Sequence, residues 1–202
     1  DEALPVTQEA VEIYRELTET SPDRYRPDLA RALDNLGVRF SELGRLDEAL
    51  PVTEDAVTVR RQLATASPDR YRPDLASSLD HAGVRLWALG RPAEALPLAE
   101  EAVSIYQELA AGSPGRYRPD LARSLSNLGI WLWTLGLPTE ALPAAQEAAA
   151  IRRELAAESP DRYRIDFAQS LNNLSIIYSA LGSLPDALLA AREAVDAYRE
   201  LT

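Results

Sequence analysis

Three asparagines and one histidine occupy a single position of a repeating sequence. Asn35, His81, Asn127 and Asn173 follow one another at a spacing of 46 residues. A carboxamide offers both a hydrogen-bond donor and an acceptor, so a ladder of such groups can pair with the backbone of an extended peptide. The alternative is that these side chains cap or bridge neighbouring helices. The chemistry indicated is recognition, not bond making.

Two indoles share a second repeated position. Trp87 and Trp133 lie one repeat apart, and Trp131 lies two residues from Trp133. Indole rings in a groove are natural anchors for a protein partner, because they bury a large apolar area and keep one polar handle. The alternative is packing between helices, which we favour for Trp131.

Catalytic side chains are scarce. The chain has one histidine, His81, no cysteine and no lysine. A Ser–His–acid set would have to use His81, which merely replaces an asparagine of the repeat. A zinc site would lack its usual nitrogen and sulfur ligands, and no glycine-rich phosphate loop follows a strand. We expect no enzymatic activity, no metal site and no cofactor.

The elements that carry these residues repeat with the same period. The block Ser-Pro-Asp-Arg-Tyr-Arg-Pro-Asp-Leu-Ala begins at Ser21 and returns, with few changes, at Ser67, Ser113 and Ser159. A fixed period of this length predicts a solenoid in which each unit contacts only its neighbours.

Each repeat contains two helical patterns. Apolar residues at spacings of three and four from Leu29 to Leu43, with Pro27 as the first helical residue and Gly44 as the C-cap, predict a first helix over 27–43. A second helix is predicted over 47–65, and the Arg-Tyr-Arg segment between helices is predicted to be a structural junction whose tyrosine packs between repeats. The remaining first helices are expected at 73–89, 119–135 and 165–181, and the remaining second helices at 2–20, 93–111, 139–157 and 185–201.

The prediction is therefore an all-α protein of nine antiparallel helices. It forms one array over 1–202, divided into a lone helix (1–20), three full repeats (21–66, 67–112 and 113–158) and a last repeat (159–202). Because both ends fall inside the repeat and the first residue is not Met, we expect a fragment of a longer array.

Composition narrows the choice of partners. All 21 basic residues are arginine, and the net charge is −11. This charge disfavours nucleic acid and an anionic membrane surface, both of which require a basic footprint. No apolar run of about 18 residues and no signal peptide is found, so a cytoplasmic location is expected.

The pattern within a repeat resembles the tetratricopeptide repeat. Leu33, Leu-Gly at 36–37, Phe40, Gly44, Ala49 and Ala56 stand at the offsets of that family. The small residues would let the paired helices approach closely. The resemblance implies a right-handed α-solenoid of helix pairs. The longer unit resembles the kinesin-light-chain branch, and the Arg-Tyr-Arg-Pro-Asp repeats resemble those of large actinobacterial proteins that carry NTPase or caspase-like domains.

In tetratricopeptide arrays the first helix of each pair lines the concave face. The resemblance therefore implies which side chains form a peptide-binding groove. They are Arg31, Asp34, Asn35, Val38, Asp80, His81, Val84, Trp87, Arg123, Asn127, Ile130, Trp133, Asn172, Asn173 and Ile176. Asp34 and Asp80, with the absence of lysine, argue against the clamp for a peptide C-terminal carboxylate that chaperone adaptors of this family use.

Two functions remain open. One is a scaffold that binds an extended segment of another protein in this groove. The other is a spacer or self-associating arm of a larger multidomain protein, in which the terminal helices stack end to end through apolar faces that include Ile13 and Leu17 at one end and Leu188 and Val195 at the other. An engineered array is a further alternative, although the drift among the second helices favours a natural sequence.

Overall fold

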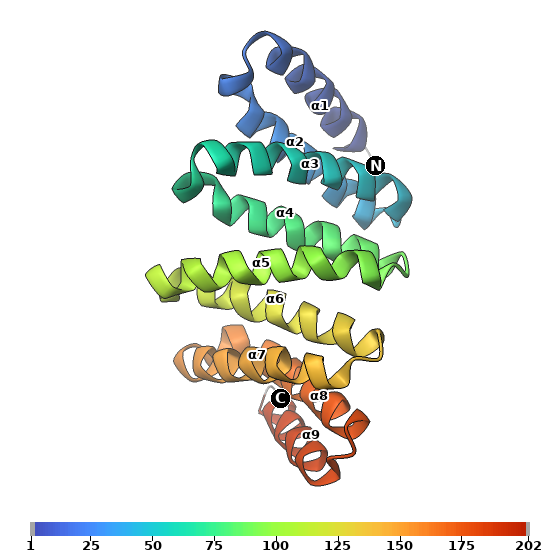
Figure 1. Ribbon diagram of the computed structural model, residues 1–202, viewed down its shortest axis with the longest axis vertical. Coiled ribbons are helices and arrows are strands. Elements are labelled where there is room, and N and C mark those ends of the chain that lie inside the picture. The colour runs from blue at the N-terminus through green and yellow to red at the C-terminus, as the bar shows by residue number, and fades with distance from the viewer. Residues whose placement is uncertain (1–2, 201–202) are drawn as a thin grey trace. The chain divides into compact units, whose positions relative to one another are not determined.

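The protein is all-helical. The computed structural model describes residues 3–200, which form nine α-helices and no strand (Figure 1). Residues 2 and 201, assigned above to the first and last helices, lie outside the described part. The helices are α1 (Ala3–Thr20), α2 (Pro22–Glu42), α3 (Leu46–Ala66), α4 (Pro68–Ala88), α5 (Pro92–Gly112), α6 (Pro114–Thr134), α7 (Pro138–Glu158), α8 (Pro160–Ala180) and α9 (Leu184–Arg199).

The chain divides into two compact units, 1–105 and 106–202, with the boundary inside α5. Within each unit, helices that follow one another in the sequence pack together: α1 with α2, α2 with α3 and α3 with α4, and then α6 with α7, α7 with α8 and α8 with α9. The predicted all-α class is confirmed. The predicted single continuous array stays a prediction.

The first helix of each repeat begins earlier than predicted. Helix α2 begins at Pro22 and not at Pro27, and α4, α6 and α8 begin at the equivalent prolines. Pro22 suits the first helical position, because its missing N–H would have no partner there, and the Tyr25 N–H already donates to the Ser21 carbonyl at 3.2 Å. Pro27 lies inside the helix, where it forfeits about one backbone hydrogen bond. The predicted junction is therefore the first part of a helix.

An arginine–tyrosine contact recurs in this first part of the helix. The guanidinium carbon of Arg24 lies 5.1 Å from the ring centroid of Tyr25, and the same pairing occurs in α4, α6 and α8 at 4.9 to 5.0 Å. A guanidinium over an aromatic face is attracted by the ring quadrupole. The repeated motif thus fixes its own side chains locally.

Glycine ends each of these helices, as predicted for Gly44. Its φ of 71° lies in the left-handed region, which costs glycine nothing. The Gly44 N–H donates to the Ser41 carbonyl at 3.0 Å, and the Arg45 N–H donates to the Phe40 carbonyl at 2.9 Å. This is a Schellman motif, and it satisfies the last carbonyl groups of the helix. It turns the chain directly into the second helix of the pair.

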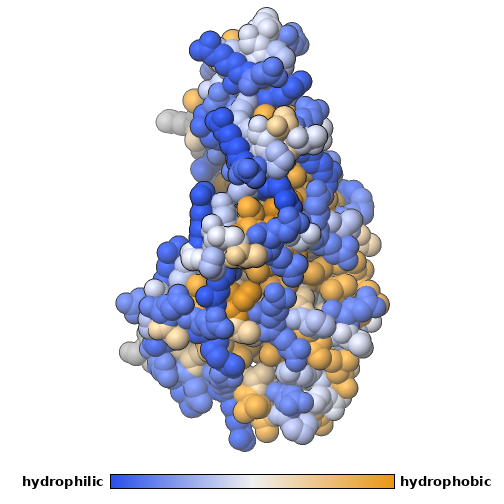
Figure 2. Space-filling view, turned by 60° about the vertical axis from the view of Figure 1, so that its left-hand side comes forward, coloured by the Kyte–Doolittle hydropathy of each residue, from blue (hydrophilic) through white to orange (hydrophobic). Residues whose placement is uncertain are grey.

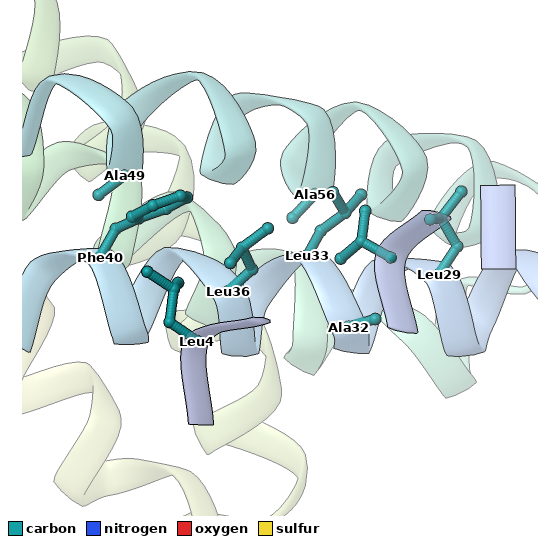
Figure 3. Close-up of a cluster of buried hydrophobic side chains, with 9 residues drawn as sticks. Leu4, Leu29, Ala32, Leu33, Leu36, Phe40, Ala49 and Ala56 are labelled. Carbon is teal, nitrogen blue, oxygen red and sulfur yellow. The ribbon is translucent and has the colours of Figure 1, made fainter. Parts of the chain in front are cut away.

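The core of the first unit forms where α1, α2 and α3 meet. Leu33, Leu36 and Phe40 of α2 are at most 5% exposed, and they pack with Leu4 of α1 and with Ala49 of α3 (Figure 3). Gly37 lets α2 and α3 approach. A Cβ atom added there would lie 2.6 Å from the Thr53 hydroxyl oxygen. The structural role predicted for these small residues is confirmed.

The second unit repeats this packing with looser contact at its glycine. A Cβ atom added at Gly129 would lie 3.5 Å from the Ala141 carbonyl oxygen and from Ala145, which is ordinary contact. Trp131 is 2% exposed and belongs to the interior, as favoured above. The first helices of the pairs therefore keep one side buried and leave the other side for further interactions.

Candidate functional site

In the first unit, three predicted groove residues line one cavity. Arg31, Asn35 and Val38 of α2 face Val6 and Tyr14 of α1 across a cavity of about 500 Å³. The Arg31 guanidinium is held by the Asp28 carboxylate at 2.5 Å. The polar and apolar lining is mixed, and the Asn35 carboxamide is exposed.

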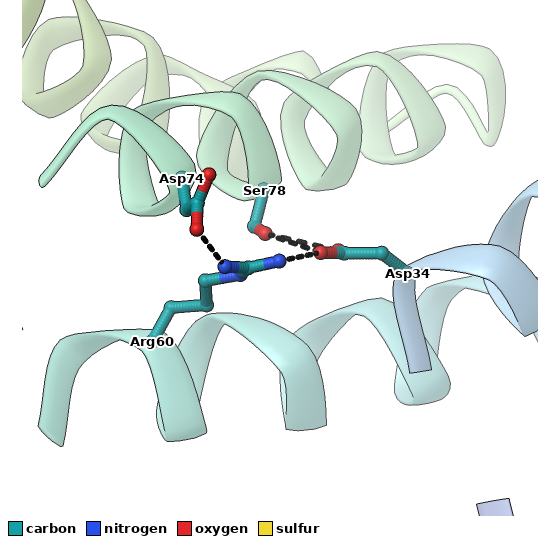
Figure 4. Close-up of polar contacts among 4 residues, drawn as sticks. All are labelled: Asp34, Arg60, Asp74 and Ser78. Atoms are coloured by element: carbon teal, nitrogen blue, oxygen red, sulfur yellow. Dashed lines mark hydrogen bonds and ion pairs between the residues drawn. The ribbon is translucent and has the colours of Figure 1, made fainter. Parts of the chain in front are cut away.

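Asp34 has an internal role. Its carboxylate lies 2.9 Å from a terminal nitrogen of Arg60 in α3, and the Ser78 hydroxyl of α4 donates to both of its oxygens at 2.9 and 3.1 Å (Figure 4). Arg60 also pairs with Asp74 of α4. The side chains of Arg60 and Asp34 are only 9% and 18% exposed. One buried arginine thus joins three helices, and Asp34 is committed to it.

Asp80 is also internal. It is 2% exposed, so the prediction that it faces a ligand is wrong. The helix wheel misplaced it because a wheel drawn for one helix does not include the packing around that helix. Asp34 and Asp80 therefore leave the set of proposed ligand contacts.

A second buried arginine links α2 to α4. The Nε of Arg85 donates to the Ser41 hydroxyl oxygen at 2.9 Å, and Arg85 is 5% exposed. Burial lowers the pKa of the Arg85 guanidinium, and the charge of Asp34 opposes that shift. The contact region between the first helices of this unit is therefore built from charged and hydroxyl groups.

The rest of the predicted face of α4 is accessible. Val84 and Trp87 are each 43% exposed, and His81 is partly buried. Figure 2 shows that hydrophobic side chains reach the surface in patches bordered by hydrophilic ones. Exposed apolar side chains on an otherwise polar surface are candidates for partner contact.

In the second unit, four predicted residues meet in an apolar cavity. Ile130 and Trp133 of α6 and Asn173 and Ile176 of α8 line it, together with Ile177. Its volume is about 90 Å³. A cavity of about 150 Å³ holds a benzene ring, so this one suits a branched aliphatic side chain and not an indole. The Asn173 carboxamide at its rim can pair with a peptide backbone.

The other predicted residues of the second unit surround this cavity less closely. Asn172 is exposed and Asn127 is partly buried. The exposed Arg123 pairs with Asp120 at 3.0 Å. None of these three lines the cavity, so the second unit gathers four of its seven predicted residues.

A partly buried arginine is present in this unit as well. Arg152 of α7 donates to the Ser170 hydroxyl at 2.6 Å and to the Asp166 carbonyl at 3.1 Å. Burial lowers the pKa of Arg152, while Asp166 raises it and Arg123 lowers it. It occupies the repeat position of Arg60, but Ser126 stands where Asp34 would be.

Sequence reasoning missed Arg60, Arg85 and Ile177. A signal for Arg60 exists, because the equivalent residues one repeat away are Tyr14 and Tyr106. An arginine among tyrosines on the inner face of a helix predicts a buried, paired charge.

Within residues 3–200 no helix is long and apolar enough to cross a membrane. The same residues bring together no group of three or more His, Asp or Glu side chains that could hold a metal ion.

The fold and the exposed side of the first helices define a class of protein, the α-solenoid repeat proteins built from helix pairs. The family follows from the sequence itself. The tetratricopeptide repeat profile matches residues 29–68, 75–111, 121–161 and 167–202, so the chain belongs to the tetratricopeptide repeat family. Comparison with curated proteins gives no match.

Solved structures share the fold at low sequence identity. A Podosopora anserina protein described as a kinesin light chain with nearly identical repeats has 21% identity and a TM-score of 0.68, covering 96% of this chain and 88% of that one. BtubC from P. vanneervenii has 17% identity and a TM-score of 0.58, covering 98% and 90%. MamA has 14% identity and a TM-score of 0.63, covering 96% and 90%.

Proposed function

We propose that this protein is an interaction scaffold that binds an extended peptide segment of another protein along the first helices of its pairs. Tetratricopeptide repeats generally mediate protein interactions, and this face of the chain carries the side chains that such binding uses. The observation that carries the proposal is the cavity of about 90 Å³ formed by Ile130, Trp133, Asn173, Ile176 and Ile177.

The chemistry of the cavity favours one kind of contact. An aliphatic side chain of the peptide enters between Ile130 and Ile176, the exposed indole of Trp133 covers it, and the Asn173 carboxamide pairs with the adjacent peptide backbone. Apolar pockets with a few placed polar groups are the usual form of such sites. Within the second unit, Asn127 and Asn172 add polar contacts. Within the first unit, Asn35 offers a polar contact, and Val84 and Trp87 offer an apolar one.

A peptide-display selection tests the proposal. Random twelve-residue peptides are selected on the wild-type chain, and the affinity of the enriched peptides is measured by calorimetry. Trp133→Ala and Asn173→Ala are each expected to weaken binding by about tenfold, because an anchor side chain contributes at least 1–2 kcal/mol. Filling the cavity with Ile130→Phe has the same expected result.

The matched control lies on another surface. Leu188→Asp changes an exposed apolar residue of α9 that is no part of this face and should leave the affinity unchanged. Far-UV circular dichroism confirms that each variant is helical. If no peptide is enriched, or if enriched peptides bind the Trp133 and Asn173 variants as tightly as the wild type, the scaffold proposal fails.

A further inference from the structure

A second cavity of the second unit lies between two successive second helices. It has a volume of about 280 Å³ and is lined by α7, α8 and α9. Helix α8 contributes Leu171, Leu174 and Tyr178 to it, whereas Asn173 and Ile176 line the cavity of the proposed peptide site. The two cavities therefore use different sides of α8 and are separate sites.

Two alanines give this cavity its room. Ala149 of α7 and Ala190 of α9 line it and are 4% and 5% exposed. They occupy the repeat positions of Val11 and Val52 in the first unit, where Val11 is 2% exposed and Val52 packs against the core. A shortened buried side chain leaves a void wherever its neighbours do not collapse onto it. The second unit thus has open space where the first unit carries valine side chains.

The floor of the cavity is apolar. Leu171 and Leu174 are 2% and 8% exposed, and both belong to its lining together with the two alanines. A hydrocarbon chain laid on this floor is removed from water, which is the main favourable term in apolar burial. The floor therefore suits an unbranched aliphatic stem.

An ion pair closes one end of the cavity. Nη2 of Arg153 donates to both carboxylate oxygens of Glu193 at 2.8 Å, which joins α7 to α9. The two opposite charges leave this end neutral. Gln146 and Asp186 each precede one member of this pair by seven residues, or two helical turns, which is about 10 Å along the helix. They therefore border the opposite end of the cavity.

Two oxygen atoms at that opposite end lack a donor. The Gln146 amide nitrogen donates to the Tyr178 hydroxyl at 2.9 Å, and the Ser183 hydroxyl donates to Oδ2 of Asp186. Among residues 3–200, the Gln146 carbonyl oxygen and Oδ1 of Asp186 accept no hydrogen bond, and Asp186 makes no ion pair. This end therefore offers two acceptors and one negative charge.

We propose that this cavity binds a lysine or arginine side chain of a partner protein. Its aliphatic stem lies on the leucine floor, and its cation donates to Asp186 and Gln146. Lysine and arginine are suited to such a site because they bury their stems on apolar surface while the charged head stays in water. The unpaired acid at the mouth and the net charge of −11 are complementary to a cationic partner.

NMR titration with blocked tripeptides tests the site. Tripeptides with lysine or arginine between two alanines are expected to shift the methyl signals of Leu171 and Leu174 in a saturable way. The norleucine tripeptide keeps the stem without the charge and should bind about threefold to fivefold more weakly, as expected for an exposed charge pair. Failure of both basic tripeptides, or equal binding of the norleucine tripeptide, overturns the proposal. So does binding of the n-pentylammonium ion alone, because the site would then take free amines and not a protein side chain.

Three variants locate the contact. Ala149→Val introduces the residue that the repeat carries at Val11 and should weaken binding of the lysine tripeptide by about tenfold, because it fills the floor. Asp186→Asn keeps an acceptor for Ser183 but removes the charge, and should weaken binding by about threefold to fivefold. Asp161→Asn is the matched control, since Asp161 is an exposed acid in the first turn of α8 and is no part of the cavity.

Far-UV circular dichroism confirms that each variant is helical. Wild-type affinity in the Asp186→Asn chain contradicts the proposal even if Ala149→Val disturbs the fold. An Asp161→Asn chain that loses as much affinity as Asp186→Asn contradicts it as well, because the attraction would then come from the overall charge and not from this site.

Discussion

The two units of this protein use the same helix frame but fill the space between neighbouring first helices differently. In the first unit, Ser41 and Arg85 meet by a hydrogen bond of 2.9 Å, and Arg85 is 5% exposed. At the equivalent positions of the second unit, Trp133 and Ile177 line an apolar cavity. We call the contact region between neighbouring first helices the seam. The repeat determines the backbone on both sides of the seam, and individual side chains determine its chemistry.

The difference decides where a ligand side chain can enter. A buried guanidinium keeps its hydrogen bonds only if its partners stay in place, and its desolvation cost is offset only by those partners. The seam of the first unit is consequently filled by its own groups. An apolar seam with a void lacks only dispersion contacts, so in the proposed function the second unit exchanges its void for a peptide side chain.

The largest expected effect comes from the buried indole of the second unit. Trp131 is 2% exposed, so Trp131→Ala should lower the free energy of unfolding by about 3–5 kcal/mol, through lost transfer energy and a cavity. Urea unfolding followed by circular dichroism measures it. Trp133→Ala, two residues away and 40% exposed in the wild type, should cost about 1 kcal/mol or less. Equal losses for the two indoles would contradict this division between core and binding surface.

The next largest effect is expected from a substitution in the charged seam of the first unit. Asp34→Ala removes one of the two carboxylates that pair with the buried Arg60 and should lower the free energy of unfolding by about 1.5–3 kcal/mol, since Arg60 then keeps only Asp74 as an ionic partner. Ser126→Ala changes the equivalent residue of the second unit, whose buried hydroxyl oxygen makes no hydrogen bond within the described residues, and should stay within about 0.5 kcal/mol because no bond is lost. The same urea titration compares them. An Asp34→Ala chain as stable as the Ser126→Ala chain would show that the ionic network contributes nothing.

A third pair of variants should change stability in opposite directions. Gly37→Ala places a Cβ atom 2.6 Å from the Thr53 hydroxyl oxygen and 3.3 Å from Arg85, so crowding of about 1–3 kcal/mol outweighs the better helix propensity. Gly129→Ala meets its neighbours at 3.5 Å and should gain up to about 1 kcal/mol from that propensity. Thermal unfolding of both variants beside the wild type measures the signs. A shared sign would mean that the two helix pairs are equally tight.

The sequence predicted the positions and the buried sides of the helices more fully than the contacts between neighbouring first helices. Repeated glycines, prolines and apolar spacing determine where helices turn and which side is buried, and these are local properties of the chain. The starts of the first helices were wrong by five residues, because Pro22 and Pro27 are both compatible with a first turn. The hydrogen bonds that the Ser21 carbonyl accepts decide between them.

The burial of Asp80 and the pairing of Asp34 could not be predicted, because the periodicity of a single helix does not include its tertiary contacts, and the partners of Asp34 lie far away in the sequence. Asp34 reaches Ser78, 44 residues away. A helix wheel places both carboxylates on the outer face, but Asp34 pairs with Arg60 of α3 and Ser78 of α4, and Asp80 is 2% exposed. Asp34 and Asp80 therefore no longer argue against a ligand that bears a carboxylate. The exposed arginines predicted for the groove, Arg31 and Arg123, are paired with Asp28 and Asp120.

The smallest effect concerns the turn between helices of a pair. In the first unit, Arg45 binds Glu48 through two nitrogens at 2.5 and 2.7 Å, and Arg91 binds Glu94 in the same way, whereas the second unit has Leu137 at the equivalent position. The hydrogen bonds from Arg45 hold the pKa of the Glu48 carboxyl below its ordinary value, and Arg91 does the same for Glu94. A carboxyl whose pKa is lowered in the folded state stabilises the fold above its unfolded pKa and loses that contribution as the pH falls through the folded pKa.

An NMR titration of the glutamate side chains tests this turn directly. Arg45→Gln should raise the pKa of Glu48 to its ordinary value and leave the pKa of Glu94 where it is, because each carboxyl depends on its own arginine. Both groups are fully exposed, so salt screens the pairs and the change in stability should be small. If Glu48 keeps its lowered pKa without Arg45, the shift comes from the helix start at α3 and not from the pair. The replacement of this arginine by Leu137 in the second unit would then make no difference to the turn. The two units would differ only in the contacts between their first helices.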